Sequence, residues 1–319
     1  MVLSVDGIAT PVEGIDDPAL ARVLAAIVEA SRDVSAHVRA GALLPAPDPE
    51  GARNVHGEVV HPLDILGTER FVEAFDASNT VAGLVCEELE APKFFEVAAD
   101  SNSYTCVLDP IDGTSNADIA ITIGSIFGVF PTPHGVRLEG EQPFLRPGSD
   151  LVAAGYVLYG SNTVLVLATP DLVQEFTLDA GSGEFRLTRE NVRIPQACPY
   201  YSVNQGYADR WDPAVRRAVD VAREGRSLRY VGSLVSDFHR DLIRGGVFLY
   251  PADSNSPKGK IRVLYEAAVF AYVAAQAGGG ASTGHGPVLD LVPASVHERT
   301  PLFVGNASAV EAIDQALRS

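Results

Sequence analysis

The stretch that decides the fold reads YTCVLDPIDGTSN and spans residues 104–116. Its first five residues form an apolar run that is typical of a buried β-strand. Pro110 and Gly113 favour a tight turn directly after that strand. The turn would bring the carboxylates of Asp109 and Asp112 together, beside backbone N–H groups that can face an anion. Such a pair can hold a hard divalent cation against a phosphate, whereas the acids of an ordinary exposed turn would simply face water.

A second pair of acids follows another apolar run upstream. Residues 80–88 read TVAGLVCEE, so Glu87 and Glu88 lie at the end of a predicted strand. In open α/β sheets, ligands gather at the carboxyl ends of strands. Two solvated glutamates are the alternative, but two strands that each end in paired acids favour a metal site.

The chain has only three lysines, and two of them lie together in SPKGKIRVLYE at 256–266. Lys258, Lys260 and Arg262 precede a predicted helix, whose N-terminus would also attract anions. Glu266 begins an apolar helix, so an inward-facing carboxylate there requires a cation. A glutamate that faces water is the alternative.

Two further segments, YSVNQGY at 201–207 and RYVGS at 229–233, combine tyrosine, amide and arginine donors. These donors suit a phosphate or a sugar. Without context, however, both segments are also consistent with ordinary strand and loop residues.

Charge and motif content exclude several classes of protein. The chain has 319 residues with 41 acids against 24 bases, a formal charge of −17, which disfavours nucleic acid and anionic membrane as partners. The three cysteines are too few and too scattered for a disulfide framework or a CxxC metal site. GxSxG, P-loop and GxGxxG motifs are absent from the sequence, so serine hydrolases, P-loop NTPases and dinucleotide enzymes have no support.

The N-terminal sequence lacks a basic region followed by an apolar core, and the apolar runs are shorter than the ~18 residues of a membrane helix. We therefore expect a cytoplasmic protein without a membrane partner.

Hydrophobic periodicity predicts an α/β protein with two mixed halves and a boundary near residue 190. Helices are expected at 18–41, 62–77, 212–224, 235–244 and 262–277. Strands are expected at 80–86, 104–108, 119–130, 151–159, 163–168, 248–250 and 302–304, with a hairpin within 177–194.

Taken together, these motifs resemble those of class I fructose-1,6-bisphosphatases, in order from about Val23 to Ile313. DPxDG[ST] alone indicates only the wider Mg-dependent phosphatase superfamily, which includes inositol monophosphatase. The more specific segments are SIFGVF at 125–130, YSVNQGY at 201–207, RYVGSLVSDFHR at 229–240, GGVFLYP at 245–251 and SPKGKIRVLYE at 256–266.

The resemblance implies a layered αβαβα sandwich, with a metal-binding half at 1–190 and a sugar-phosphate-binding half at 191–319. It implies two or three Mg²⁺ per subunit, with Mn²⁺ as a possible substitute, and a homotetramer. The implied metal ligands are Glu87, Asp109, Asp112, Glu266 and the carbonyl of Ile111.

The same resemblance assigns the remaining site residues. Asp64 and Glu88 would orient and deprotonate the attacking water, and Glu58 would reach a further metal from a mobile loop. The implied 1-phosphate residues are Gly113, Thr114 and Ser115 next to Asp112. The implied 6-phosphate and sugar residues are Asn204, Tyr207, Tyr230, Tyr250, Lys260 and Arg262, with Arg229 donated by a neighbouring subunit.

The implied activity is hydrolysis of the 1-phosphate of fructose 1,6-bisphosphate. The alternatives are a sedoheptulose-1,7-bisphosphatase or dual-specificity enzyme, an inositol monophosphatase-like enzyme, and a non-catalytic sugar-phosphate sensor. A sensor is disfavoured because the metal-site acids are all present.

The sequence departs from the family at its AMP site. Asp17-Pro18 precedes the first helix, Ser103-Tyr104 replaces a Lys-Tyr pair, and Pro131-Thr132-Pro133 replaces a segment that carries an arginine. We therefore predict weak or absent inhibition by AMP. A cysteine-bearing insertion of the plastid type is also absent from the sequence, so we expect no thioredoxin control.

Overall fold

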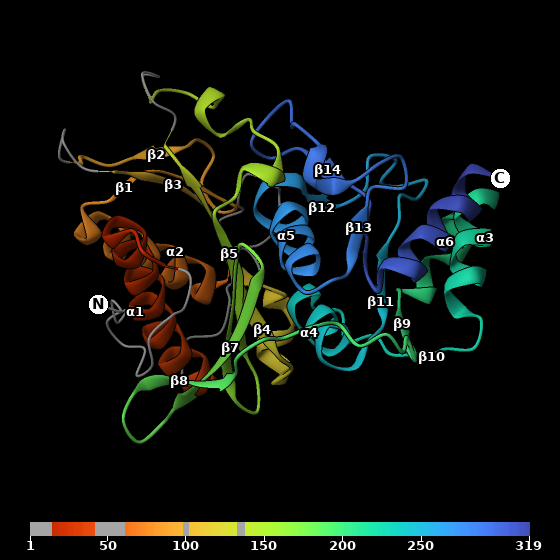
Figure 1. Cartoon of the computed structure of the whole chain (residues 1–319), viewed down its shortest axis with the longest axis horizontal. Coiled ribbons are helices and arrows are strands. Elements are labelled where there is room, and N and C mark those ends of the chain that lie inside the picture. The colour runs from red at the N-terminus through yellow and green to blue at the C-terminus, as the bar shows by residue number, and fades with distance from the viewer. Residues whose placement is uncertain (1–14, 42–60, 98–101, 133–137) are drawn as a thin grey trace.

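The structure is a computed structural model that describes residues 15–41, 61–97, 102–132 and 138–319. Figure 1 shows its layers side by side, in the order helices, large sheet, helices, small sheet, helices. The αβαβα sandwich expected from the sequence is therefore confirmed.

The large sheet has eight strands in the order β2-β1-β3-β4-β5-β6-β7-β8. β1 and β3 run parallel, and the other neighbouring pairs run antiparallel. The parallel pair brings the carboxyl ends of β1 and β3 to one edge of the sheet. The strands are β1 (Val81–Cys86), β2 (Lys93–Phe94), β3 (Tyr104–Asp112), β4 (Ile123–Pro131), β5 (Ala153–Tyr159), β6 (Thr163–Thr169), β7 (Leu172–Asp179) and β8 (Glu184–Arg189).

One face of this sheet is covered by α1 (Pro18–Ala40) and α2 (Pro62–Ser78), as Figure 1 shows. The carboxylate of Asp17 begins α1 by accepting the backbone N–H of Ala19 at 2.7 Å, and proline follows at the first helical position. Apolar residues of both helices and of the sheet share one buried core, which excludes water from this face.

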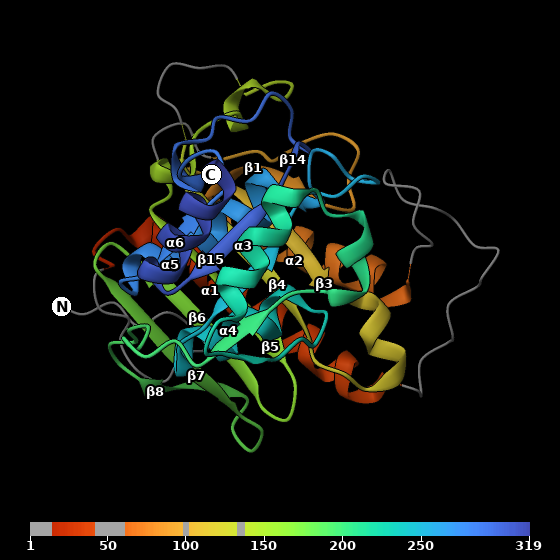
Figure 2. The same ribbon diagram turned by 90° about the vertical axis from the view of Figure 1, so that its right-hand side faces the viewer.

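The other face packs against a central helical layer, α4 (Leu234–Arg244) and α5 (Ala268–Gln276). Beyond it lies a five-stranded sheet in the order β10-β9-β11-β15-β13, which α3 (Pro213–Arg223) and α6 (Ala307–Arg318) cover on the outside (Figure 2). Its strands are β9 (Tyr200–Ser202), β10 (Ser227–Leu228), β11 (Val247–Tyr250), β13 (Gly280–Ser282) and β15 (Leu302–Gly305). A separate antiparallel pair is formed by β12 (Ile261–Arg262), just before the turn that leads into α5, and β14 (Arg299–Thr300).

Two sequence expectations about elements are wrong in detail. The strand expected at 119–130 begins only at Ile123, because Thr114–Ile119 form a 3₁₀ helix that ends at Ala120 with a left-handed φ of 56°. The helix expected at 262–277 begins as a π turn, Val263–Ala267, before α5 continues it. The short β2 and the C-terminal α6 were not predicted from the sequence.

Within the described ranges, every helix is too short or too polar to span a membrane.

Candidate active site

The parallel register of β1 and β3 places the two acidic motifs side by side. Cys86, the last residue of β1, is opposite Leu108, and the backbone N–H of Glu87 donates to the carbonyl of Leu108 at 3.0 Å. The turn with Glu87 and Glu88 therefore begins next to Asp109, as the sequence pattern predicts.

The DPIDG segment forms an irregular end of β3. The pairing of β3 with β4 shifts register between Asp109 and Asp112, and the N–H of Ile111 donates to Asp109 Oδ1 at 3.1 Å. Gly113 follows at φ 78°, a left-handed conformation that glycine adopts without strain. A Cβ at Gly113 would also lie 3.1 Å from the Cβ of Ser233, so the turn needs a glycine for space as well.

The N-terminus of α4 holds Asp112 from the other side. Asp112 Oδ2 accepts the hydroxyl of Ser233 at 2.9 Å and the N–H of Val235 at 3.1 Å. These two bonds join the end of β3 to the central helical layer.

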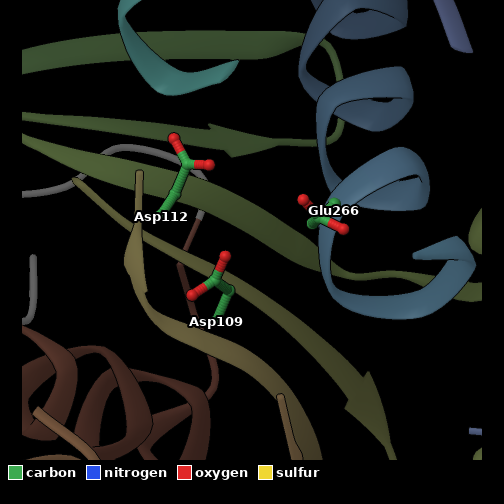
Figure 3. Close-up of side chains that lie close together, drawn as sticks. All are labelled: Asp109, Asp112 and Glu266. Atoms are coloured by element: carbon green, nitrogen blue, oxygen red, sulfur yellow. The ribbon is translucent and has the colours of Figure 1, made fainter. Parts of the chain in front are cut away.

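Glu266 completes the acidic group from the π turn. Its Oε2 accepts the backbone N–H of Arg262 at 2.6 Å. One carboxylate oxygen from each of Asp109, Asp112 and Glu266 lies within 4.8 Å of the others, and Figure 3 shows the three side chains facing a common space. Oxygen donors at this spacing are what a hard divalent cation requires.

Burial and mutual repulsion disfavour negative charge on this group, which we call the acidic cluster (Glu87, Asp109, Asp112 and Glu266). Burial, followed by repulsion from Glu87, raises the pKa of Asp109 well above its usual value. Burial raises the pKa of Asp112 to about 6, against the hydrogen bonds from Val235 and Ser233. Burial and then Glu87 raise the pKa of Glu266 to about 8, although the nearby Arg262 lowers it. A bound cation would relieve this repulsion, so the donor set fits a metal.

Arg262 contributes a positive charge at the same place. Its Nη2 lies 2.9 Å from Glu87 Oε1, in an ion pair that is largely buried. The sequence expectation that Arg262 lies at the site is consistent with this position.

A cavity of about 580 Å³ opens over the acidic cluster. It is large enough for a phosphate and part of a sugar. Its lining consists of His61, Asp64, Glu87, Glu88, Asp109, Ile111, Asp112, Gly113, Thr114, Ser115, Asp118, Arg262 and Glu266.

Asp64 faces this cavity from the first turn of α2. Its Oδ1 accepts the hydroxyl of Thr114 at 2.7 Å, and its Oδ2 accepts the backbone N–H of His61 at 3.1 Å. The ring of His61 in turn accepts the N–H of Leu63, which completes a capping box. Burial raises the pKa of Asp64. A carboxylate with a raised pKa at the edge of a metal site can accept a proton from water.

Two lining residues were missed by the sequence reasoning. His61 Nε2 lies 3.2 Å from Asp118 Oδ1, so the pair links α2 to the 3₁₀ helix after the DPIDG turn. The spacing of His61 and Asp64 is that of a capping box and could have indicated the first residue. Nothing local indicates its pairing with Asp118.

Residues of the YSVNQGY, GGVFLYP and SPKGKIRVLYE segments lie together beside the acidic cluster, on what we call the tyrosine side of the site. Asn204, Tyr207 and Tyr250 line one small pocket, and Lys260 Nζ lies 4.8 Å from the centre of the Tyr207 ring. Tyr230 is close enough to Asn204 and Tyr207 that both influence its pKa, which burial raises to about 12. The phenol of Tyr230 therefore stays protonated near neutral pH and can donate a hydrogen bond.

One expected site residue of the described part of the chain, Arg229, lies apart from these tyrosines. Arg229 is exposed, donates to the carbonyl of Leu228 at 2.8 Å, and lies 5.6 Å from the centre of the Tyr200 ring. Glu58 lies outside the described residues.

A buried carboxylate holds the RYVGS loop in place. Asp237, on the first turns of α4, accepts the backbone N–H groups of Val231 and Gly232 at 3.0–3.1 Å and pairs with Arg240 Nη1 at 2.9 Å. This interaction fixes the backbone on either side of Tyr230. Sequence reasoning did not single out Asp237, although its place four residues after the Ser233 cap was the available signal.

Comparison with known proteins identifies the family. Residues 12–190 match the family model described as the N-terminal domain of fructose-1-6-bisphosphatase, and residues 194–318 match that of its C-terminal domain. A class 1 fructose-1,6-bisphosphatase of Sorangium cellulosum is 45% identical over 293 residues, which cover 89% of this chain and 84% of the relative. A cytosolic fructose-1,6-bisphosphatase of Brassica napus is 45% identical over 269 residues, which cover 82% of this chain and 79% of the relative.

The fold agrees with these matches. The crystal structure of Leishmania major fructose-1,6-bisphosphatase in holo form has a TM-score of 0.90 to this chain at 33% identity, over 96% of both chains. The chain belongs to the fructose-1,6-bisphosphatase family.

Proposed function

We propose that the chain hydrolyses the 1-phosphate of fructose 1,6-bisphosphate, releasing fructose 6-phosphate and phosphate, as an enzyme of carbohydrate metabolism such as gluconeogenesis. The observation that carries this proposal is the meeting of three carboxylates within 4.8 Å at the edge of a cavity of about 580 Å³. The names of the relatives favour the six-carbon substrate over a sedoheptulose bisphosphate.

The activity depends on a metal, for which the acidic cluster supplies the ligands. Glu87, Asp109, Asp112, Glu266 and the carbonyl of Ile111 would hold it, as two or three Mg²⁺ per subunit or as Mn²⁺. When bound, the metal offsets the charge of the phosphate oxygens and lowers the pKa of the attacking water.

Asp64 and Glu88 would act on that water. Asp64 is fixed by two hydrogen bonds and lines the cavity, so its carboxylate is placed to take the proton. Glu88 lines the same cavity and would orient the nucleophile.

The turn after β3 would bind the 1-phosphate. Gly113, Thr114 and Ser115 line the cavity directly after Asp112, and a 3₁₀ turn begins there. Backbone N–H groups in such a turn suit an anion, and they would position the phosphorus for in-line attack.

The tyrosine side of the site would bind the 6-phosphate. Asn204, Tyr207, Tyr230 and Tyr250 provide neutral donors, and Lys260 provides the positive charge that this acidic chain otherwise lacks. Arg229 would act from a neighbouring subunit, and its exposed position in this chain supports that assignment.

We also propose that the enzyme is a cytoplasmic homotetramer with a metal-binding half at 1–190 and a sugar-phosphate half at 191–319. The cytosolic relatives support the location. The two family matches, which meet between residues 190 and 194, support the division.

The test is phosphate release in millimolar Mg²⁺ from fructose 1,6-bisphosphate, sedoheptulose 1,7-bisphosphate and inositol 1-phosphate. We expect the fructose substrate to be the fastest. Asp112→Asn should lower turnover by roughly 10³-fold or more, because it removes a charge that acts on the transition state. Asp290→Asn, at an exposed carboxylate, is the matched control. Near-normal turnover by the Asp112 variant would refute the site, and faster hydrolysis of either other substrate would refute the specificity.

A further inference from the structure

The turn that carries Glu87 and Glu88 is held at three places. The N–H of Glu87 bonds to Leu108 at 3.0 Å, and the N–H of Leu89 closes the turn on the last carbonyl of β1 at 3.1 Å. The third bond comes from a residue 208 positions away, since His297 Nε2 lies 3.0 Å from the carbonyl oxygen of Leu89.

The same imidazole ring contacts the π turn that carries Glu266. His297 Nδ1 lies 2.9 Å from the hydroxyl of Tyr265, and the two rings meet edge to face with centroids 6.0 Å apart. Tyr265 is fully buried and precedes Glu266 directly. One side chain thus joins two separate elements that carry acids of the cluster.

Hydrogen-bond chemistry fixes the direction of the bond to Leu89 and, for a neutral ring, that of the bond to Tyr265 as well. The carbonyl of Leu89 can only accept, so His297 Nε2 carries the proton. In the neutral ring Nδ1 is then an acceptor, and Tyr265 must donate its hydroxyl proton to it. The order of donation is therefore Tyr265 to His297 to Leu89.

The backbone around His297 is itself anchored to the site. The carbonyl of Glu298 accepts the N–H of Val263 at 2.8 Å, and Arg299 pairs with Arg262 in the short β12–β14 ladder. Val296, on the other side, is buried. The ring therefore projects from a segment that is fixed relative to the π turn.

The acidic cluster needs a connection of this kind because its carboxylates repel one another. Without a cation, the repulsion between Glu87 and Glu266 favours their moving apart and is opposed by the ion pair of Glu87 with Arg262. Each such displacement has to be reversed before a metal can bind, which lowers the affinity.

We propose that His297 is a positioning residue that holds the Glu87–Glu88 turn at its metal-binding distance from Glu266, through its bond to the carbonyl of Leu89. The inference rests on the proposed role of the acidic cluster, and it assigns to His297 no contact with the substrate.

Three substitutions separate the two bonds of the ring. His297→Asn keeps a polar atom near Tyr265 but is too short to reach Leu89. His297→Gln places an amide N–H₂ near the position of Nε2 and can still donate to Leu89. Tyr265→Phe removes the donor to Nδ1 and leaves the bond to Leu89. His285→Asn, at an exposed histidine, is the matched control.

The first readout needs no catalysis. It is the Mg²⁺ concentration that half-saturates the rise in unfolding temperature, and hydrogen exchange of amides 87–90 in metal-free protein accompanies it. We expect His297→Asn to raise that concentration roughly threefold to tenfold and to speed the exchange, with a smaller effect in Tyr265→Phe. His297→Gln and the control should stay close to the wild type.

Steady-state kinetics give the second readout. We expect the Mg²⁺ activation midpoint to rise in parallel, while KM for fructose 1,6-bisphosphate at saturating Mg²⁺ is unchanged. An unchanged Mg²⁺ midpoint in His297→Asn would overturn the proposal, as would equal losses in His297→Asn and His297→Gln, which would assign the effect to ring packing. If His297→Asn does not fold, His297→Phe, which keeps a ring but cannot donate to Leu89, takes its place, and a wild-type midpoint in that variant overturns the proposal. The Asp112 variant tests the proposed function separately, because it loses turnover whether or not His297 has this role.

Discussion

Substituting Glu266 by glutamine should stabilise the metal-free protein while abolishing its activity. Glutamine has nearly the same shape, and its carbonyl oxygen can still accept the 2.6 Å hydrogen bond from the backbone of Arg262. The substitution therefore removes little but a negative charge from a buried group of like charges. The direction of the effect follows from the raised pKa of Glu266.

The magnitude follows from the same shift. The pKa of Glu266 rises from 4.5 to about 8 on folding, so the folded chain favours the protonated form. The associated stability is fully present below pH 4.5 and is lost as the pH rises through about 8. At about 1.4 kcal/mol for each pH unit, this difference amounts to about 5 kcal/mol if Glu266 alone carried the repulsion. Because the rest of the acidic cluster shares it, we expect a gain of about 2–3 kcal/mol at pH 8.5 and almost none at pH 4.5.

The assay is urea unfolding in EDTA at pH 4.5, 7 and 8.5, with turnover measured separately in Mg²⁺. We expect the stability of the wild type to fall with pH more steeply than that of Glu266→Gln, and Mg²⁺ to stabilise the wild type much more than the variant. Turnover of the variant should fall by roughly 10³-fold or more. A variant that is less stable than the wild type at pH 8.5 would show that Glu266 is not repelled by its neighbours, and the electrostatic reasoning would fail.

Three further outcomes are expected. Burial raises the pKa of Asp241 to about 7, although Arg240 Nε lies 3.4 Å from its Oδ1 and opposes the shift. Neither of its side-chain oxygens makes a well-formed hydrogen bond in the described part of the chain. Asp241→Asn should therefore stabilise the protein by about 1 kcal/mol at pH 8.5 and little at pH 4 in the same urea assay. Asp237→Asn breaks the ion pair with Arg240 that holds the RYVGS loop in place. It should raise KM for fructose 1,6-bisphosphate by roughly tenfold without changing the Mg²⁺ activation midpoint. An unchanged KM would contradict the role given to Asp237. AMP at millimolar concentration should leave turnover unchanged. The carboxylate of Asp17, before the first helix, already accepts the N–H of Ala19 and, at 2.6 Å, the hydroxyl of Tyr104, so it would repel a phosphate bound at that helix. Inhibition at micromolar AMP would contradict this prediction.

Local signals in the sequence were sufficient to predict that Glu87, Asp109 and Asp112 lie close together. The DPIDG turn depends on a proline and a glycine within five residues, and Glu87 follows an apolar strand directly, so both positions could be predicted from neighbouring residues alone. The parallel register of β1 and β3 then brings the two segments together, as expected for the carboxyl edge of a sheet.

Long-range contacts left no such signal. The partner of His61 is 57 residues away and the carbonyl held by His297 is 208 residues away, and neither pair has a spacing that a helix or a strand would produce. The Asp237 contact is local, and the place of Asp237 after the Ser233 cap was its one signal, because the backbone N–H groups that it binds leave no mark on the identity of the residues that donate them. The short strand β2 pairs through only two positions, too few for any alternation to be visible.

The π turn before α5 shows why even a correct helix prediction can misplace a functional residue. The apolar run at 262–277 predicts one continuous helix, and the structure instead inserts a wider turn at Val263–Ala267. An inserted residue changes the direction of side chains on either side by roughly 100°, so a face assigned from the apolar positions of α5 cannot be extended back to Glu266. Glu266, within this turn, faces Asp109 and Asp112 of β3 (Figure 3), and Phe270 of α5 packs in the core against Tyr156 of β5. Glu266 is itself part of that wider turn, and we infer that the direction of its carboxylate toward Asp109 and Asp112 depends on the π turn as well as on the glutamate itself.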